Sequence, residues 1–378
     1  MPRDETTPHL RVARLPWTTD INPYQRAVYG ELAEVGVHCV ATAGLTTDWL
    51  VAHRARIDVL HVHWHLERLA DDAPLDSPPA AWVCGQLDLA RTLGYAIAWT
   101  VHESGRLLLG RDGYEDTVVE ALLRLSDVVV THDEPTARFV VELGQARRHR
   151  PVDVVVAPPG SYDSFAAAPA ATADPVDAAR RLGIAVGDRV VLSLGAQRWD
   201  KDLPLLLAAF DDLARADAVL AIVGPIRDDV ARSALDGVDP RRVRVLDDWA
   251  SDEFVAACFA LADVAVLARS RDWTSSSLLL ATAHATPIVA ADLPTNRALV
   301  GDHGARWFTP GDSASLTLAI GNALDDPDGG SERVLAAQRH ASRTTWSDSA
   351  LVTATAFRSA VARRSAPSVV APEPALHV

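Results

Sequence analysis

Residues 190–210 read Val-Val-Leu-Ser-Leu-Gly-Ala-Gln-Arg-Trp-Asp-Lys-Asp-Leu-Pro-Leu-Leu-Leu-Ala-Ala-Phe, and they are the most informative part of the chain about its fold. The first five residues form an apolar run typical of a buried parallel strand, and an amphipathic helical pattern begins at Leu203. Between them, Gly195 permits close backbone approach, and Arg198 and Lys201 supply two cations. Ligands of open α/β sheets bind at the carboxyl ends of strands, so we expect this loop to bind a diphosphate. A solvated loop is the alternative.

Short apolar runs alternate with amphipathic helical patterns along the whole chain. This alternation predicts an α/β protein whose parallel sheets are covered by helices on both faces. Because it occurs twice, we expect two Rossmann-like domains that face each other across a cleft. The expected strands are 10–15, 37–42, 58–64, 96–102, 127–132 and 152–157 in the first series, and 189–194, 218–223, 243–246, 263–268, 287–291 and 305–308 in the second.

The domain boundaries follow from changes in pattern. We expect an N-terminal domain over 1–163 and a C-terminal domain over 176–345. Residues 164–175 between them are small, rich in Ala and Pro, and without periodicity, which predicts an interdomain linker. A last helix over 346–364 is expected to cross back toward the first domain. The tail 365–378, rich in Pro, Ala and Ser, is expected to be disordered.

Composition excludes several classes of protein. The 378 residues carry a formal net charge of −14, which argues against a nucleic-acid partner and against strong adhesion to an anionic membrane. The three dispersed cysteines suggest neither a disulfide framework nor a thiolate metal site. No apolar stretch is long enough to span a bilayer and the start is polar, so we expect a cytoplasmic protein. The basic run 147–150 allows at most peripheral membrane contact, and a solvated loop is the alternative.

With these motifs the chain resembles the GT-B glycosyltransferases, close to the group 1 superfamily and its mannosyltransferase-like branches. The resemblance rests on the Gly195, Arg198 and Lys201 loop, on the segment 263–277, and on strand ends of the first half such as 99–102. It implies that a nucleotide-sugar donor binds the second domain. The two cations would then meet the donor diphosphate.

The helix opening after the expected strand 263–268 is the second part of this donor site. Its hydroxyls and unpaired backbone N–H groups suit an anion, since helix N-termini attract negative charge. The alternative is an ordinary N-cap run, because Ser and Thr are favoured at helix starts. The expected donor-binding residues are Gly195, Arg198, Lys201, Thr274, Ser275, Ser276 and Ser277.

The chain departs from the family pattern around this helix. The family commonly carries two glutamates seven residues apart, whereas Asp272 and Leu280 stand here. Asp272 is expected to keep the first acid's catalytic role near the transferred sugar, but Leu280 cannot accept a hydrogen bond from a ribose. His102, at the end of an apolar strand, is the other expected catalytic residue, because the resemblance implies that it contacts the donor sugar. The alternative is a hydrogen-bonded structural histidine. Glu103 is the candidate for general acid–base work.

Acceptor binding is expected in the loop after the first strand, through Trp17, Asp20, Asn22 and Tyr24. An N-cap role for Asn22 is the alternative. The alternating residues His61, His63 and His65 are expected to point to opposite faces of a strand, and therefore not to converge on a metal.

These observations favour an enzyme that moves a hexose from a nucleotide diphosphate sugar to a hydroxyl-bearing small-molecule or lipid-linked acceptor. Fixed cations replace a metal in this interpretation, so we expect metal-independent transfer without a cofactor. Two alternatives stay open: a nucleotide-sugar epimerase of the same architecture, and a non-catalytic binder of nucleotide sugars. The sequence leaves the donor, the acceptor and the stereochemistry undetermined.

Overall fold

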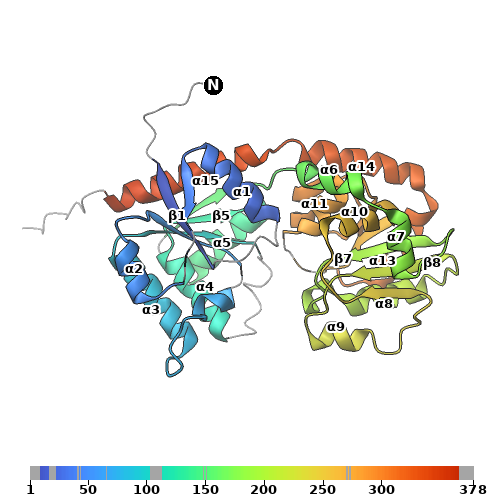
Figure 1. The fold of residues 1–378 in the computed structure, drawn as a ribbon, viewed down its shortest axis with the longest axis horizontal. Helices are drawn as coiled ribbons and strands as arrows, with labels where there is room; N and C mark the ends of the chain where they lie inside the picture. The colour runs from blue at the N-terminus through green and yellow to red at the C-terminus, as the bar shows by residue number, and fades with distance from the viewer. Residues whose placement is uncertain are drawn as a thin grey trace, which may run out of the picture.

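The computed structural model describes residues 9–16, 23–40, 42, 44–64, 66–102, 113–147, 149, 151–269, 271 and 274–365. The chain forms two lobes side by side, each built on a parallel six-stranded sheet covered by helices (Figure 1). The predicted α/β class with two Rossmann-like units is therefore confirmed.

The first sheet has the strand order β2-β1-β3-β4-β5-β6, and every neighbouring pair is parallel. Its four central strands are largely buried because both faces carry helices, which explains their continuous apolar sequence. The strands are β1 Leu10–Leu15, β2 Val37–Val40, β3 Val59–Val62, β4 Ala96–Thr100, β5 Val128–Thr131 and β6 Asp153–Val156. The helices are α1 Pro23–Glu34, α2 Thr47–His53, α3 Pro79–Thr92, α4 Gly113–Leu125 and α5 Glu134–Ala146, with a 3-10 turn η1 Leu66–Ala70.

The second sheet has the order β12-β11-β10-β7-β8-β9. Successive strands are added outward in one direction from β7 to β9 and in the other from β10 to β12. The boundary between β7 and β10 is therefore a switch point, where open α/β sheets bind ligands. The strands are β7 Arg189–Leu194, β8 Ala218–Val223, β9 Val243–Leu246, β10 Val264–Leu267, β11 Ile288–Ala291 and β12 Arg306–Phe308. The other elements are η3 Trp199–Lys201, α8 Leu203–Asp212, α9 Asp229–Ala234, α10 Asp252–Leu261, α11 Ser276–Ala283, α12 Pro294–Val300, α13 Ser313–Asp325 and α14 Pro327–Ala341.

The connection between the sheets, where the sequence shows no periodicity, is helical. It contains α6 Asp163–Thr172, with Pro169 inside the helix, and α7 Pro175–Leu182. Alanine has the highest helix propensity, and five alanines in α6 outweigh the missing periodicity. Both helices pack on α10 of the second lobe.

The last helix, α15 Trp346–Ser365, returns to the first lobe and packs along α1 and β4 (Figure 1). Several polar contacts fasten it there, among them one near each end of the helix. The Trp346 indole Nε1 donates to the Ser161 carbonyl at 2.8 Å, and the Arg364 guanidinium pairs with the buried Asp127 carboxylate at 3.1 Å. Of the tail 365–378 predicted to be disordered, Ser365 is the last residue of α15, and 366–378 lie outside the described residues.

Candidate active site between the two lobes

A cluster of three cations surrounds one buried carboxylate beside the ends of β7 and β10. Asp200, only 2% exposed, pairs with Arg198 at 2.9 Å and with Arg269 at 3.6 Å. Burial alone would raise the pKa of Asp200, but Arg269 and Arg198 hold it below its usual range. With Lys201 the cluster carries three cations against one anion when all are ionised, so it can bind a ligand of about two negative charges.

Lys201 is the only lysine in the chain, beside 35 arginines. Burial and the field of Arg269 lower the pKa of its amine to about 7, against the pull of Asp200. A compact ammonium shifts its pKa readily when buried, whereas a guanidinium stays charged. The one lysine of the chain is thus buried in this cluster, where its charge can change near neutral pH.

Gly195 and its neighbours bring together the donor residues expected from sequence. The Lys201 Nζ and the Ser277 Oγ both donate to the Leu194 carbonyl, at 3.1 and 3.3 Å. A Cβ on Gly195 would lie 3.4 Å from each of these two polar atoms, and the residue has a φ of +100°. At Gly224, with a φ of +138°, a Cβ would lie 2.4 Å from the Gly195 carbonyl oxygen. The loop requires both glycines.

The start of α11 completes the cluster and joins it to the first lobe. Ser275 is the N-cap, and its hydroxyl accepts from the Leu278 N–H at 3.3 Å, so the N-cap interpretation of this residue is correct. Ser276 receives a hydrogen bond from the Tyr162 hydroxyl at 3.4 Å. The Thr274 N–H donates to the His102 carbonyl at 3.2 Å, which fixes the end of β4 against the approach to α11.

A cavity of about 180 Å³ adjoins these residues. It opens between the start of α1, helix α6 and the ends of β7 and β8. Its lining is mainly apolar and includes Trp249, Leu280 and Phe165, with Arg26 and Asp252 as charged members. An apolar cavity beside a cation cluster suits a ligand with an aromatic end and an anionic end.

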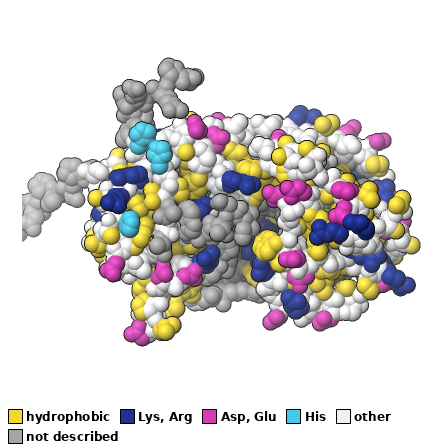
Figure 2. All heavy atoms as spheres, viewed as in Figure 1, with side chains coloured by type: hydrophobic (Ala, Val, Ile, Leu, Met, Phe, Trp, Pro, Cys, Tyr) yellow, Lys and Arg dark blue, Asp and Glu magenta, His cyan; other side chains and the backbone are white. Residues whose placement is uncertain are grey.

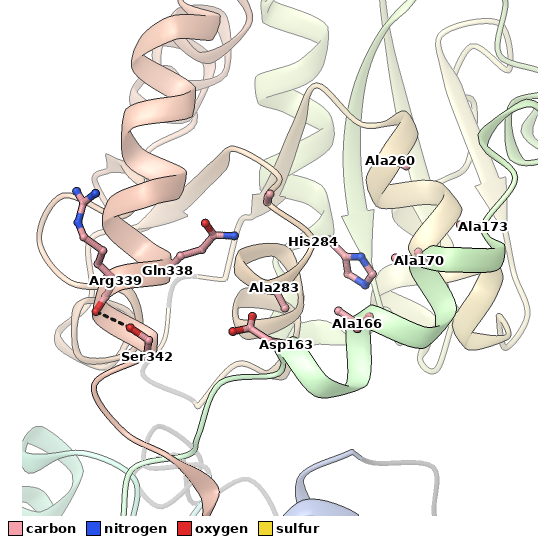
Figure 3. Close-up of a pocket in the computed structure, with 13 residues that line it drawn as sticks. Asp163, Ala166, Ala170, Ala173, Ala260, Ala283, His284, Gln338, Arg339 and Ser342 are labelled. Atoms are coloured by element: carbon pink, nitrogen blue, oxygen red, sulfur yellow. Dashed lines mark hydrogen bonds between the residues drawn. The ribbon is translucent and has the colours of Figure 1, made fainter.

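A larger cavity, about 660 Å³, lies between α6, α10, α11 and α14. Figure 3 shows alanines on its walls, and the His284 ring, the Asp163 carboxylate and Gln338 around it. Among the lining residues that the structure describes, the two cavities share only His284. The larger cavity is therefore a separate feature from the cation cluster.

The ends of β3, β4 and β5 carry a cluster of histidines, of which His61, His63 and His132 are buried. His61 and His63 lie on one side of β3, with ring centroids 4.1 Å apart. The expectation that they point to opposite faces is wrong, because residues two apart on a strand share a face. His102 is half-buried, and both its ring nitrogens hydrogen bond to other histidines, His63 at 3.1 Å and His132 at 3.0 Å.

Of the acceptor residues expected from sequence, the structure describes Tyr24. It is 5% exposed, and its ring packs edge-on against His102, His132 and Trp346. Tyr24 therefore packs among the histidines, and its role in acceptor binding stays a prediction. The other expected acceptor and catalytic residues, together with His65, lie outside the described residues: Trp17, Asp20, Asn22, Glu103 and Asp272.

Three further features bear on partners. Over the described ranges, no group of three or more His, Cys, Asp or Glu side chains could hold a metal ion. No described helix is long and apolar enough to cross a membrane. In the basic run 147–150, Arg147 and His149 both contact the Glu120 carboxylate, and Figure 2 shows acidic and basic side chains interspersed on the visible face.

Residues 188–326 match the family described as Glycosyl transferases group 1. No curated protein is similar enough in sequence to count as a relative. The matched segment contains the Gly195 loop, Lys201, Arg269 and α11, which together form the cation cluster.

Solved structures share the fold over most of the chain. A sucrose-phosphate synthase from Thermosynechococcus elongatus has a TM-score of 0.67 at 18% identity, covering 94% of this chain and 100% of that one. A UDP-forming alpha,alpha-trehalose-phosphate synthase from Burkholderia xenovorans, in complex with glucose-6-phosphate, has a TM-score of 0.64 at 16% identity, covering 82% and 75%. An E. coli protein described as trehalose-6-phosphate bound with UDP-2-fluoro glucose has a TM-score of 0.69 at 11% identity, covering 92% and 98%.

The fold is that of the GT-B enzymes. Within this fold, residues 188–326 are similar to the glycosyl transferases group 1 family. The mannosyltransferase-like branch stays a prediction.

Proposed function

We propose that this protein transfers a hexose from a nucleoside diphosphate sugar to a hydroxyl group of a small polar acceptor, without a metal ion. The observation that carries the proposal is the cluster of Arg198, Lys201 and Arg269 around Asp200 at the switch point of the second sheet. Its surplus of positive charge matches a diphosphate.

The cluster supplies electrostatic stabilisation to the leaving group. Negative charge builds on the diphosphate as its bond to the sugar breaks, and fixed cations stabilise that charge most in the transition state. The cations are held before the substrate arrives, Arg198 by Asp200 and Lys201 by the Leu194 carbonyl. The protein therefore needs to reorganise little when the diphosphate leaves.

The cavity beside the cluster is the proposed nucleoside site. Trp249 offers an aromatic face to a base, and Gly195 and Gly224 open the backbone on the same side. Leu280 lines this cavity and cannot accept a hydrogen bond from a ribose. Asp252 also lines it, in the first turn of α10, so we assign the ribose contact to this carboxylate.

The acceptor is proposed to reach the site from the first lobe, over the ends of β3 and β4. Hydroxyl-bearing sugars and sugar phosphates are the first candidates, because glucose-6-phosphate is the ligand in one structure of the same fold. The epimerase alternative needs no acceptor, and the non-catalytic alternative predicts binding without turnover.

A single assay separates these three functions. The protein is incubated with UDP-, GDP- and ADP-hexoses, each with and without a panel of sugar and sugar-phosphate acceptors. Free nucleoside diphosphate, the configuration of the sugar and binding of the donor are measured. We expect release that depends on the acceptor. Formation of an epimer without an acceptor would support the epimerase, and binding with no release under any pairing would support the binder.

Two variants connect the activity to the cluster. Arg198→Ala should lower kcat/KM for the donor about ten- to a hundredfold, since a charge-assisted contact contributes about 1.5–3 kcal/mol. Arg242→Ala is the matched control, because Arg242 makes a similar 3.0 Å pair with Asp211 elsewhere in the second lobe. Equal kinetics in the two variants would contradict the proposed diphosphate site.

A further inference from the structure

A continuous line of hydrogen bonds crosses the first sheet at the carboxyl ends of its strands. It begins at the Thr100 hydroxyl, which lies 2.7 Å from the His61 Nε2. The Tyr29 hydroxyl of α1 lies 2.7 Å from the His61 Nδ1 and 2.8 Å from the His63 Nε2. The line continues from His63 to His102.

The line ends on a main-chain carbonyl. His102 Nδ1 lies 3.0 Å from the His132 Nε2, and the His132 Nδ1 lies 3.2 Å from the Ala157 carbonyl oxygen. The rings are closely packed: His61, His63 and His132 are at most 2% exposed. All four strands from β3 to β6 therefore contribute to one chain of polar groups.

The carbonyl at the end fixes every proton in the line. Because a carbonyl oxygen only accepts, the His132 Nδ1 must carry the proton and donate to Ala157. The neutral His132 then accepts at Nε2, so the His102 Nδ1 must donate to it. By the same step the His63 Nδ1 donates to the His102 Nε2.

The remaining groups follow in the same order. The Tyr29 hydroxyl donates to the His63 Nε2 and accepts from the His61 Nδ1. The Thr100 hydroxyl donates to the His61 Nε2. All four histidines are thus protonated on Nδ1. The opposite arrangement would place two acceptors, the His132 Nδ1 and the Ala157 oxygen, against each other.

We propose that His63 and His132 are positioning residues that hold His102, at the edge of the cleft, as a neutral imidazole protonated on Nδ1, so that His102 takes up no proton during the reaction. A proton added to the His102 Nε2 would face the Nδ1–H of His63 and break the line. The statement that His102 takes up no proton during the reaction rests on the proposed function, whereas the tautomer of His102 does not depend on it.

The surroundings of the line also disfavour a positive charge. Among the described residues, the ionisable groups near the line include Arg14 of β1, Cys39 of β2, and Tyr24 and Tyr29 of α1, with Tyr162 next to Tyr24. Helix α15 contributes Phe357 against His61. Burial, with the nearby Arg14, lowers the pKa of His61 to about 3. The backbone carbonyl of His102 accepts from the Thr274 N–H, which precedes α11.

The test uses the full chain labelled with ¹⁵N-histidine, without substrate. The shifts of imidazole nitrogens distinguish the Nδ1–H, Nε2–H and doubly protonated forms, and single variants assign the signals of the 13 histidines. At pH 7 we expect His61, His63, His102 and His132 to be neutral and protonated on Nδ1. Protonation of His102 on Nε2, or on both nitrogens, would overturn the proposal.

A matched pair of variants separates positioning from simple packing. Both His132→Leu and Tyr29→Phe remove one polar group of the line. Tyr29 lies on the far side of His63 from the carbonyl, so Tyr29→Phe should leave the His102 tautomer unchanged. His132→Leu removes the link to Ala157, so His102 should shift toward the Nε2–H form. Equal effects of the two variants would refute this order of protons along the line.

A kinetic measurement adds an independent readout. The acid side of the kcat/KM profile with the best donor and acceptor should change in His132→Leu and match that of the unsubstituted protein in Tyr29→Phe. If His132→Leu does not fold, the tautomer of His102 in the unsubstituted protein still decides. Absence of any turnover would contradict the proposed function and leave the NMR result standing.

Discussion

Replacement of Lys201 by methionine removes the amine and keeps a chain of similar length. We expect Lys201→Met to weaken the binding of the donor's nucleoside diphosphate on the order of ten- to a hundredfold, from the about 1.5–3 kcal/mol of a charge-assisted hydrogen bond. The melting temperature should be unchanged or higher. The folded pKa of Lys201, about 7, lies below its ordinary value, so the charged amine destabilises the fold at neutral pH and its removal costs no stability.

The same amine predicts a proton uptake on binding. A bound diphosphate offsets the field of Arg198 and Arg269 and raises the pKa of Lys201, so at pH 8 binding should take up on the order of one proton. Affinity should fall as pH rises above 7, because the amine must then be protonated first. Calorimetry in two buffers of different ionisation enthalpy measures the uptake, and Lys201→Met should abolish it.

Because the chain has a single lysine, ¹³C-labelled lysine gives one side-chain signal whose titration reports this amine directly. The reasoning is refuted if that signal titrates near its ordinary value without ligand, or if Lys201→Met binds the diphosphate as tightly as the unsubstituted protein.

Three further outcomes are expected. Gly224→Ala should lower the free energy of unfolding by about 1–3 kcal/mol in urea, since its Cβ would meet the Gly195 carbonyl; Gly187→Ala, which shares a positive φ but has open space, is the control and should cost less. The melting temperature should fall as pH drops from 6.5 to 4.5, because burial lowers the pKa of His61 to about 3 and of His132 to about 4. In this window the unfolded chain binds a proton that each buried histidine does not, so each lowers the free energy of unfolding by about 1.4 kcal/mol per pH unit. A melting temperature that does not change with pH in calorimetry would contradict this. Diphosphate release should persist in EDTA, and activity lost to EDTA but restored by Mg²⁺ or Mn²⁺ would show that the cations do not replace a metal.

Local sequence was enough to predict the twelve strands and their grouping in two sheets. Most strands are short apolar runs, and such a run carries its information locally. The strands β7, β8 and β9 therefore begin and end where the sequence predicts. The Gly195 loop was also predictable, because a strand, a glycine and two cations adjoin in the chain. The helix α6 was missed because its alanines give propensity without periodicity.

The contacts that define the site depend on the folded chain. Arg269 and Asp200 are 69 positions apart, and nothing local says that the end of β10 brings a guanidinium to that carboxylate. The line from Thr100 to Ala157 likewise needs four parallel strands to end at one edge of the sheet. Hydrophobic periodicity is a property of neighbours in the chain, whereas hydrogen-bond and charge partners are set by which strands become adjacent, and only the tertiary arrangement specifies that.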